Sequence, residues 1–360
     1  MKSNIKWLRD KLKVLNLDGM IVSNPVSIKY LIDVDAEGTL LITPKETAFL
    51  TDSRYIEMVN SMLTIDDEIV VFDIRNLSSE EYEAFFEDCT VVGFEEDYVT
   101  YSGYKRILQK YKVRSLEETE KIIEKQRQIK DENEIELIKK ACQITDDCFT
   151  FLKDYIKVGQ SERQIAARID RYFNEFADGK AFDTIVASGP NSAIPHAVPT
   201  ERRIEEGDII TIDMGCKYKG YASDMTRTIF VKYVKEEYKE VYELVLKNQK
   251  QSLTDMRDGN NFKQIVRDVE NDFGAHNYIL VHALGHGVGL EVHEFPFFSS
   301  RVDYTVKENM IVTSEPGIYI EGKFGVRIED TLQVTKYRGE ALTRSDKNYV
   351  IVDNNSKDLK

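Results

Sequence analysis

Short apolar segments alternate with helix-like segments through the first 120 residues, and this alternation limits the fold more than any other feature of the chain. Strand patterns occupy residues 18–24, 38–44, 46–52, 67–73 and 90–95. Helical patterns occupy residues 3–16, 54–63 and 78–89. An order of this kind is typical of an α/β domain, in which helices cover the faces of a sheet.

The pattern changes at Glu117, where a highly charged segment leads into long helical periodicity. We place a domain boundary near this point, which gives an N-terminal domain of residues 1–120 and a second domain of residues 121–360. A chain of 360 residues is long enough for two domains. Helices followed by a strand pair occur twice in the second domain, which predicts an α+β fold with a hint of internal duplication.

Charge and cysteine content exclude several classes of function. The chain has 49 Lys+Arg against 63 Asp+Glu, and a formal net charge of -14 repels nucleic-acid phosphates and anionic lipid. No apolar run approaches the ~18 residues of a membrane span, and the N-terminal segment lacks the apolar region of a signal peptide. The four cysteines form no CxxC pair and are expected to be free thiols. We therefore expect a cytoplasmic protein that binds neither nucleic acid nor a membrane.

Three of the five histidines lie in one glycine-rich segment, residues 281–296. His282 and His286 are four residues apart, as in a helical metal site, but the alternating glycines around His286 argue against a helix. They do not form a phosphate-binding loop either, because the GxGxxG pattern and a following Lys-Ser/Thr are missing. Glycines beside His286 would let the backbone pass close to a bulky group, such as a metal cluster.

Two aspartates lie on a predicted strand pair upstream of this segment. A two-residue turn at Tyr218-Lys219 would place Asp213 directly opposite Asp224. Like charges in opposed positions destabilise a sheet, so such a pair is a defect unless cations lie between the oxygens. The alternative is a pair of exposed aspartates on a solvated face, and the two residues alone do not decide between these interpretations.

Two glutamates lie on the next predicted strand pair. Glu329 alternates with the apolar residues of segment 325–334 and so faces its polar side, whereas Asp330 interrupts the apolar face and is expected to be a structural acceptor. Glu315 ends the preceding strand, and Pro316 would stop the strand ladder there and aim the carboxylate.

The four carboxylates balance the charge of two divalent ions, and His286 would add a neutral imidazole. An oxygen-rich ligand set with one nitrogen favours Mn²⁺, with Co²⁺, Fe²⁺ or Zn²⁺ as alternatives. Paired metals ~3.5–4 Å apart can activate water at neutral pH and polarise a carbonyl. The residues therefore indicate a hydrolase that uses two metal ions.

These segments resemble the metallopeptidase family of prolidase and aminopeptidase P. The resemblance is carried by DMG, GYASDMTRT, GHGVGLEVHEFP, TSEPGIYI and GVRIEDTLQV, and it extends to RQIKDENEIELIKKA and FDTIVASGPNSAIPHAVPT. It implies a pita-bread catalytic domain behind a creatinase-like N-terminal α/β domain. It also implies five metal ligands: Asp213, Asp224, His286, Glu315 and Glu329.

The resemblance implies roles for further side chains as well. His196 and His293 would line the substrate site and help to stabilise the transition state. Arg327 would orient Glu329 or the substrate, and Glu315 would carry a proton besides binding metal.

The implied reaction is hydrolysis of the N-terminal Xaa-Pro bond of dipeptides or short peptides, with a Xaa-Pro dipeptidase slightly favoured over a Xaa-Pro aminopeptidase. The implied assembly is a homodimer. His282 is expected to be a supporting or structural residue, and His276 is assigned no role.

Two other functions are compatible with parts of this pattern. A methionine or general aminopeptidase of the same fold would share the ligand set, but the long N-terminal domain and the segment GVRIED favour the Xaa-Pro branch. A metal-free binding module would be a relative that had lost its metals, and the complete set of five ligands argues against it.

Overall fold

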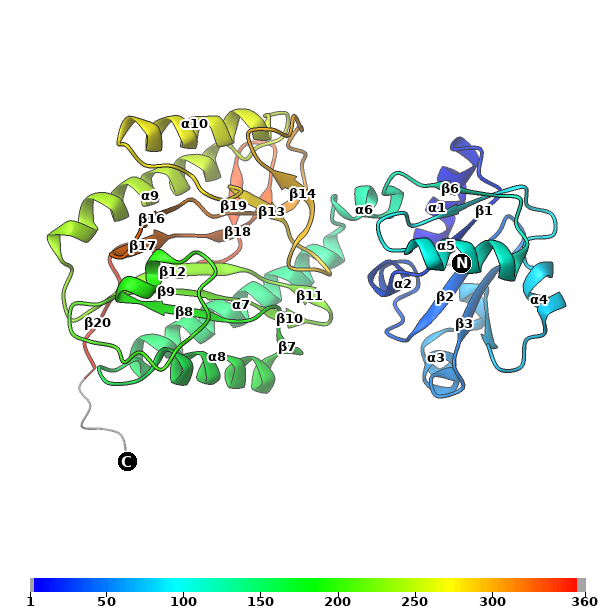
Figure 1. The fold of residues 1–360 in the computed structure, drawn as a ribbon, viewed down its shortest axis with the longest axis horizontal. Coiled ribbons are helices and arrows are strands. Elements are labelled where there is room, and N and C mark those ends of the chain that lie inside the picture. The colour runs from blue at the N-terminus through cyan, green and yellow to red at the C-terminus, as the bar shows by residue number, and fades with distance from the viewer. Residues whose placement is uncertain (1–2, 355–360) are drawn as a thin grey trace. The chain divides into compact units, whose positions relative to one another are not determined.

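The computed structural model describes residues 3–354, which divide into two compact units between Arg127 and Gln128 (Figure 1). The first unit is an α/β domain and the second an α+β domain, so the fold class predicted from the sequence is confirmed. No helix within residues 3–354 combines the length and the apolar character needed to cross a membrane.

The first unit is built on a six-stranded mixed sheet in the order β4-β3-β2-β1-β5-β6. Strand β1 runs parallel to β5 and antiparallel to β2. The elements are α1 (Ser3–Val14), β1 (Gly19–Val22), α2 (Pro25–Ile32), β2 (Gly38–Ile42), β3 (Thr47–Thr51), α3 (Ile56–Met62), the 3₁₀ helix η1 (Ile65–Asp67), β4 (Ile69–Asp73), α4 (Ser79–Ala84), β5 (Val91–Phe94), α5 (Tyr101–Tyr111), β6 (Ser115–Glu118) and α6 (Ile122–Arg127).

Both faces of this sheet are buried. Successive residues of β2 enter different apolar clusters, Leu40 and Ile42 one and Leu41 the other. Strand side chains alternate between the two faces, so helices must cover each of them. Helix α4 begins with a capping box, because the Ser78 hydroxyl accepts from the Glu81 amide and the Glu81 carboxylate accepts from the Ser78 amide.

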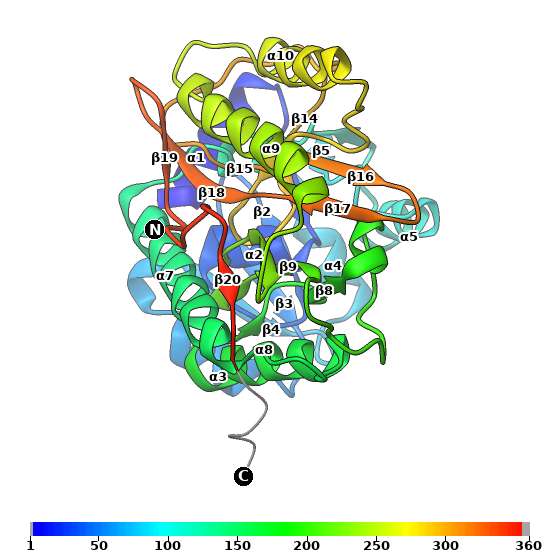
Figure 2. The ribbon, with the colours of Figure 1, turned by 90° about the vertical axis from the view of Figure 1, so that its left-hand side faces the viewer.

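In the second unit, two helix pairs enclose curved sheets. Helices α7 and α8 lie on one side of the strands and α9 and α10 on the other (Figures 1 and 2). The elements are α7 (Glu132–Tyr155), α8 (Glu162–Phe176), β7 (Gly179–Lys180), β8 (Ile185–Ser188), the 3₁₀ helix η2 (Gly189–Ala193), β9 (Ile209–Met214), β10 (Cys216–Tyr218), β11 (Tyr221–Ala222), β12 (Met225–Val231), α9 (Glu236–Asp255), α10 (Phe262–Ala275), β13 (Gly285–Gly287), β14 (Glu294–Phe298), β15 (Ile311–Ser314), β16 (Gly317–Ile320), β17 (Phe324–Arg327), β18 (Asp330–Val334), β19 (Gly339–Ala341) and β20 (Ile351–Val352).

The side chains of β9 alternate between the apolar clusters on the two faces of the strand. Ile210 and Ile212 pack with α7 and α8, whereas Ile209 packs with the cluster of α9 and α10. Asp213 lies on the same face of the strand as Ile209, four residues earlier, and therefore faces away from α7 and α8.

Candidate metal centre

The five predicted metal ligands lie at ends or irregularities of strands. Asp213 is near the end of β9, Asp224 lies between β11 and β12, Glu315 lies between β15 and β16, and Glu329 lies between β17 and β18. His286 is at the centre of β13, where the register with β14 shifts. Irregularities of this kind re-aim side chains out of the sheet pattern, which allows ligands from several strands to reach one point.

The hairpin that carries the two aspartates has a different register from the predicted one. Asp213 pairs with Thr226 and not with Asp224. The turn residues are Lys219 and Gly220, with φ of 49° and 83°. Two positive φ values in succession are typical of a type I′ turn, whose twist matches that of the strands. The predicted opposition of the aspartates was therefore wrong by two residues.

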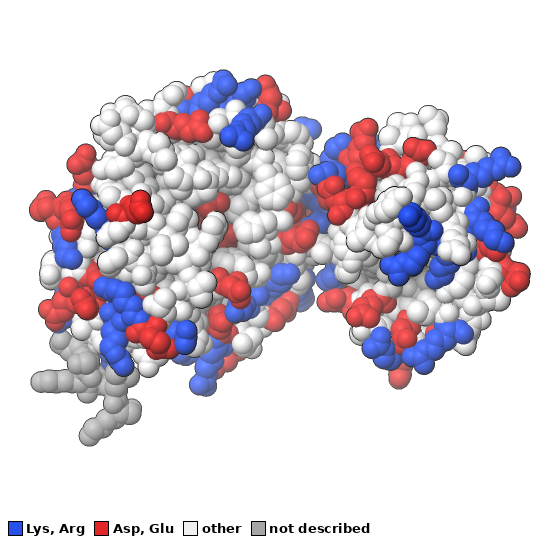
Figure 3. Space-filling model, in the orientation of Figure 1, with Lys and Arg blue, Asp and Glu red and all other residues white. Residues whose placement is uncertain are grey.

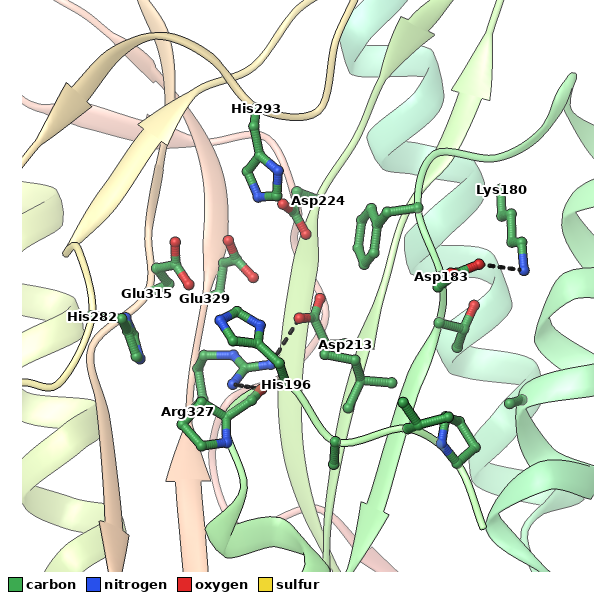
Figure 4. Close-up of a pocket in the computed structure, with 18 of the residues that line it drawn as sticks. Lys180, Asp183, His196, Asp213, Asp224, His282, His293, Glu315, Arg327 and Glu329 are labelled. Atoms are coloured by element: carbon green, nitrogen blue, oxygen red, sulfur yellow. Dashed lines mark hydrogen bonds and ion pairs between the residues drawn. The ribbon is translucent and has the colours of Figure 1, made fainter.

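The ligand atoms nevertheless converge on one cavity of about 710 Å³ within the second unit (Figure 4). Carboxylate oxygens of Asp213, Asp224 and Glu329 lie within 4.8 Å of one another. Nε2 of His286 is 3.6 Å from Oδ2 of Asp224 and 3.5 Å from Oε1 of Glu315. All five predicted ligands are thus together.

Three of these carboxylate oxygens are buried without a hydrogen-bond partner among the described residues: Oδ1 of Asp213, Oδ1 of Asp224 and Oε1 of Glu329. Burial and the neighbouring carboxylates raise the pKa of Asp224 and of Glu329 well above the usual range. Burial also raises the pKa of Glu315 to about 8. Unpaired buried carboxylates are strongly unfavourable unless they bind cations, so these residues fit a pair of divalent ions.

His286 presents a lone pair to the same space. Its Nδ1 lies 3.1 Å from the carbonyl oxygen of Gly287, which can only accept, so Nδ1 carries the hydrogen and Nε2 is free. Burial and the nearby His293 lower the pKa of His286 to about 3, which keeps the ring neutral. A Cβ at Gly287 would lie 2.6 Å from the carbonyl oxygen of Phe295. Glycine therefore permits a close approach between the backbone of β13 and that of the neighbouring segment, whereas the sequence led us to expect an approach to a bulky group such as a metal cluster.

Arg327 connects the two sides of the carboxylate cluster. Its Nη2 donates to Oδ2 of Asp213 at 2.7 Å, and its Nε donates to the hydroxyl of Thr226 at 3.1 Å. That hydroxyl donates in turn to Oε2 of Glu329 at 2.7 Å. Nη1 of Arg327 donates to the hydroxyl of Tyr319 at 2.7 Å. Sequence reasoning missed Thr226 and Tyr319, whose only signal is their place on strands beside the predicted ligands.

Asp330 is the structural acceptor that the sequence predicts. It is fully buried and accepts hydrogen bonds from Arg227 at 2.7 Å, Gln249 at 2.8 Å and Thr343 at 2.9 Å. Arg227 also donates to the main-chain carbonyl of Glu329. The network holds the backbone that carries Glu329 in place.

Three further histidines line the cavity. The rings of His286 and His293 meet edge to face with centroids 4.3 Å apart. His196 lies beside Asp213 and Arg327 (Figure 4). Nε2 of His282 is 3.0 Å from the hydroxyl of Tyr319, and burial lowers the pKa of His282 to about 4. Sequence reasoning gave His282 only a supporting role, whereas its ring is part of the cavity wall.

The side of the cavity away from His282 is lined by apolar side chains and an ion pair. Phe182 and Ile185 contribute apolar surface, and Lys180 forms an ion pair of 3.1 Å with Asp183 (Figure 4). On the face of the second unit drawn in Figure 3, charged side chains gather toward the edges and the centre is mostly uncharged. The cavity therefore combines a carboxylate and histidine cluster with apolar walls, which is typical of a site for a small organic substrate.

Comparison with known proteins finds a family match for each of the two units. Residues 136–336 match the metallopeptidase family M24, and residues 5–129 match the creatinase/prolidase N-terminal domain. A Xaa-Pro dipeptidase of Pyrococcus horikoshii is 33% identical over 97% of this chain and 99% of its own length. The solved structure of a Xaa-Pro dipeptidase from Bacillus anthracis is 34% identical, with a TM-score of 0.90 over 97% of this chain and 99% of that one.

A third relative has a different named activity. The structure of an X-Pro aminopeptidase from Thermotoga maritima is 32% identical, with a TM-score of 0.87 over 95% of this chain and 100% of that one. The chain belongs to the metallopeptidase family M24, and the protein is a metallopeptidase. The family implies a dinuclear site for divalent metal ions, which agrees with the ligand groups found here.

Proposed function

We propose that this protein hydrolyses the N-terminal Xaa-Pro bond of dipeptides and short peptides, with dipeptides as the favoured substrates. The observation that carries the proposal is the set of carboxylate oxygens on Asp213, Asp224 and Glu329 that have no hydrogen-bond partner among residues 3–354. These oxygens meet Nε2 of His286 at one cavity. Relatives of similar length named as Xaa-Pro dipeptidases support the choice of substrate.

The residues that would hold two divalent ions are Asp213, Asp224, His286, Glu315 and Glu329. When bound, such ions supply a nucleophilic water at neutral pH and polarise the carbonyl of the bond to be cut. Mn²⁺ is the ion that we propose, because four carboxylates and one imidazole form an oxygen-rich set of ligands.

The protein side chains would then transfer protons and stabilise the charge that develops on the substrate. An oxygen of Glu315 would take the proton of the attacking water and return it to the proline nitrogen as the bond breaks. The imidazoles of His196 and His293, which line the cavity, would donate hydrogen bonds to the developing oxyanion. The free α-amine of the substrate would be held near the metal ions and the carboxylates, which would restrict cleavage to the N-terminus.

Selectivity for proline would follow from the missing amide hydrogen. Proline forms a tertiary amide with no N–H. Apolar walls can close around its ring, whereas an ordinary peptide would bury an unpaired N–H there, at a cost of ~1–3 kcal/mol. His196 and Arg327 would hold the carboxylate of the proline, or the next carbonyl of a longer peptide.

A cytoplasmic location and a homodimeric assembly complete the proposal. All four cysteines are free thiols, in agreement with a reducing compartment. The resemblance to prolidases supports the dimer.

A Xaa-Pro aminopeptidase is the second candidate, because the Thermotoga maritima relative bears that name. The two candidates differ in the longest peptide that the cavity accepts. Purified protein with Mn²⁺ should cleave Ala-Pro faster than Ala-Pro-Ala-Ala. Faster cleavage of the tetrapeptide would replace the dipeptidase assignment with the aminopeptidase one.

A further inference from the structure

His196 lies on a connecting segment that has little regular structure of its own. The chain leaves β8 at Ser188, passes through η2, and reaches Thr200 well before β9 begins. Loops of this kind are usually more mobile than the strands that they join. A loop residue that must meet a reacting group therefore needs anchors outside the loop.

Glu162 is the anchor at the base of this segment. It is the first residue of α8 and its exposed fraction is 0%. One carboxylate oxygen accepts from the amide and the hydroxyl of Ser188, at 2.6 and 2.7 Å. The other accepts from the amide and the hydroxyl of Thr200, at 3.0 and 2.6 Å. Nδ2 of Asn191 lies 3.1 Å from both oxygens. One side chain thus ties together the two ends of the segment.

The negative charge of the Glu162 carboxylate is stabilised by the hydrogen-bond donors around it. Burial alone would raise the pKa of Glu162, but hydrogen bonds from Thr200 and Ser188 outweigh burial and lower that pKa below its usual value. A glutamine at this position would keep the shape of the side chain but would no longer offer two acceptor oxygens to the surrounding donors. Its amide NH₂ would face donors, and a backbone N–H cannot turn away as a hydroxyl can.

A second anchor holds the tip of the segment. Nη1 of Arg327 donates to the carbonyl oxygen of Pro195 at 3.1 Å, next to His196. Arg327 also donates to Asp213, so the tip of the segment is tied to the carboxylate cluster. Glu162 is not among the described residues that line the cavity, and its hydrogen bonds with Ser188, Asn191 and Thr200 link its carboxylate to the segment that carries His196.

We propose that Glu162 is a positioning residue that fixes the segment of residues 188–200 and so holds His196 at the substrate. This inference rests on the proposed function, because it takes His196 to act on a bound Xaa-Pro peptide. It assigns a role to a buried carboxylate that binds neither metal nor substrate.

A double-mutant cycle on the metal-loaded protein tests the proposal. Glu162→Gln should lower kcat/KM for Ala-Pro by about 10- to 100-fold, the range expected when a reacting group is slightly misplaced. In a His196→Ala background the same substitution should change kcat/KM by less than about twofold, because the residue that it positions is gone. A purely structural role would lower kcat/KM equally in both backgrounds.

Glu134→Gln is the matched control. Glu134 lies in the first turn of α7, and its carboxylate accepts hydrogen bonds from the amide of Asp131 and the hydroxyl of Tyr221, both outside residues 188–200. It should leave kcat/KM for Ala-Pro near the wild-type value. Amide hydrogen exchange within residues 189–200 should become faster in Glu162→Gln and stay unchanged in Glu134→Gln.

Thr200→Val provides a milder variant if Glu162→Gln does not fold. It removes one hydroxyl donor from the Glu162 carboxylate and should give a smaller loss in the same direction, again only when His196 is present. Equal losses in both backgrounds, or an unchanged kcat/KM, would overturn the inference and leave the proposed function intact. A wild-type protein that does not cleave Ala-Pro would instead overturn the proposed function, and this inference with it.

Discussion

At the scale of single residues, Asp224 shows why the carboxylates must act as a set. Its side chain is almost fully buried, and one of its oxygens has no hydrogen-bond partner among the described residues. One oxygen of Glu329 likewise has no hydrogen-bond partner among these residues. Burial and the neighbouring carboxylates raise the pKa of Asp224 and of Glu329, so bound cations are what make the arrangement favourable.

Removing one of these charges should therefore disable the whole site. We expect Asp224→Asn or Glu329→Gln to lower kcat/KM for Ala-Pro by at least ~10³, or about 4 kcal/mol, because the charge balance and the placement of both ions are lost together. Metal content, measured on the same samples, should fall in parallel. Near-normal turnover by metal-replete Asp224→Asn would rule out the ligand assignment.

His293→Ala serves as the contrasting variant. Its ring lines the cavity beside His286, and we assign it to the substrate and not to the metals. The variant should keep its metal and lose rate. Loss of metal from His293→Ala would mean that this role is wrong.

At the scale of elements, the buried Glu95 gives the first unit a pH-dependent stability. It follows β5, and its carboxylate accepts from the amides of Ser23 and Asn24 at 2.7 and 2.8 Å, at the start of α2. Burial outweighs these hydrogen bonds and raises the pKa of Glu95 from 4.5 to about 6. The folded state then binds a proton more tightly than the unfolded state. The stabilisation is complete below about pH 4.5 and is lost as the pH rises through about 6.

We expect the free energy of unfolding of the first unit to fall by about 2 kcal/mol across this window, and Glu95→Gln to remove the fall. The single tryptophan, Trp7, is partly buried and packs against the core of this unit, so its fluorescence during urea denaturation reports the unit directly. Glu80→Gln, on an exposed glutamate, should keep the wild-type pH dependence. Parallel curves for wild type and Glu95→Gln would contradict the expectation.

The strand pattern that places Asp213 was predictable, and the hairpin register was not. The period of two along β9 was enough to separate the apolar face from the face that carries Asp213. The register depended on a turn in which Lys219 has a positive φ. A lysine is not a usual sequence signal for this turn conformation. A shift of two residues keeps every side chain on its face, which is why Asp213 still reaches the site.

The sequence predicted the strand break after Glu315 but not the one at Glu329. Pro316 marks the interruption after Glu315, because proline cannot continue a ladder. No such residue marks the break between β17 and β18 at Glu329. The anchoring role of Glu162 was also hidden, since its partners Ser188 and Thr200 are distant in the sequence and come together only in the fold.

At the scale of the whole molecule, the first unit offers none of the predicted ligands, although it matches a domain found beside this type of catalytic unit. The family resemblance predicts a homodimer in which the first unit of one chain borders the active site of its partner. Light scattering at micromolar concentration should give twice the mass of the chain. A monomeric mass together with full activity would refute this assembly.

The proposed site uses divalent metal ions to cut the bond before proline. The most direct test is kcat/KM for Ala-Pro and for Ala-Ala, measured with Mn²⁺ and again after treatment with a chelator. We expect Ala-Pro to be cleaved at least about tenfold faster than Ala-Ala, the lower end of the penalty for burying an unpaired N–H. We also expect both rates to vanish on chelation and to return when Mn²⁺ is restored. Equal rates for the two dipeptides, or rates that survive chelation, would contradict the account.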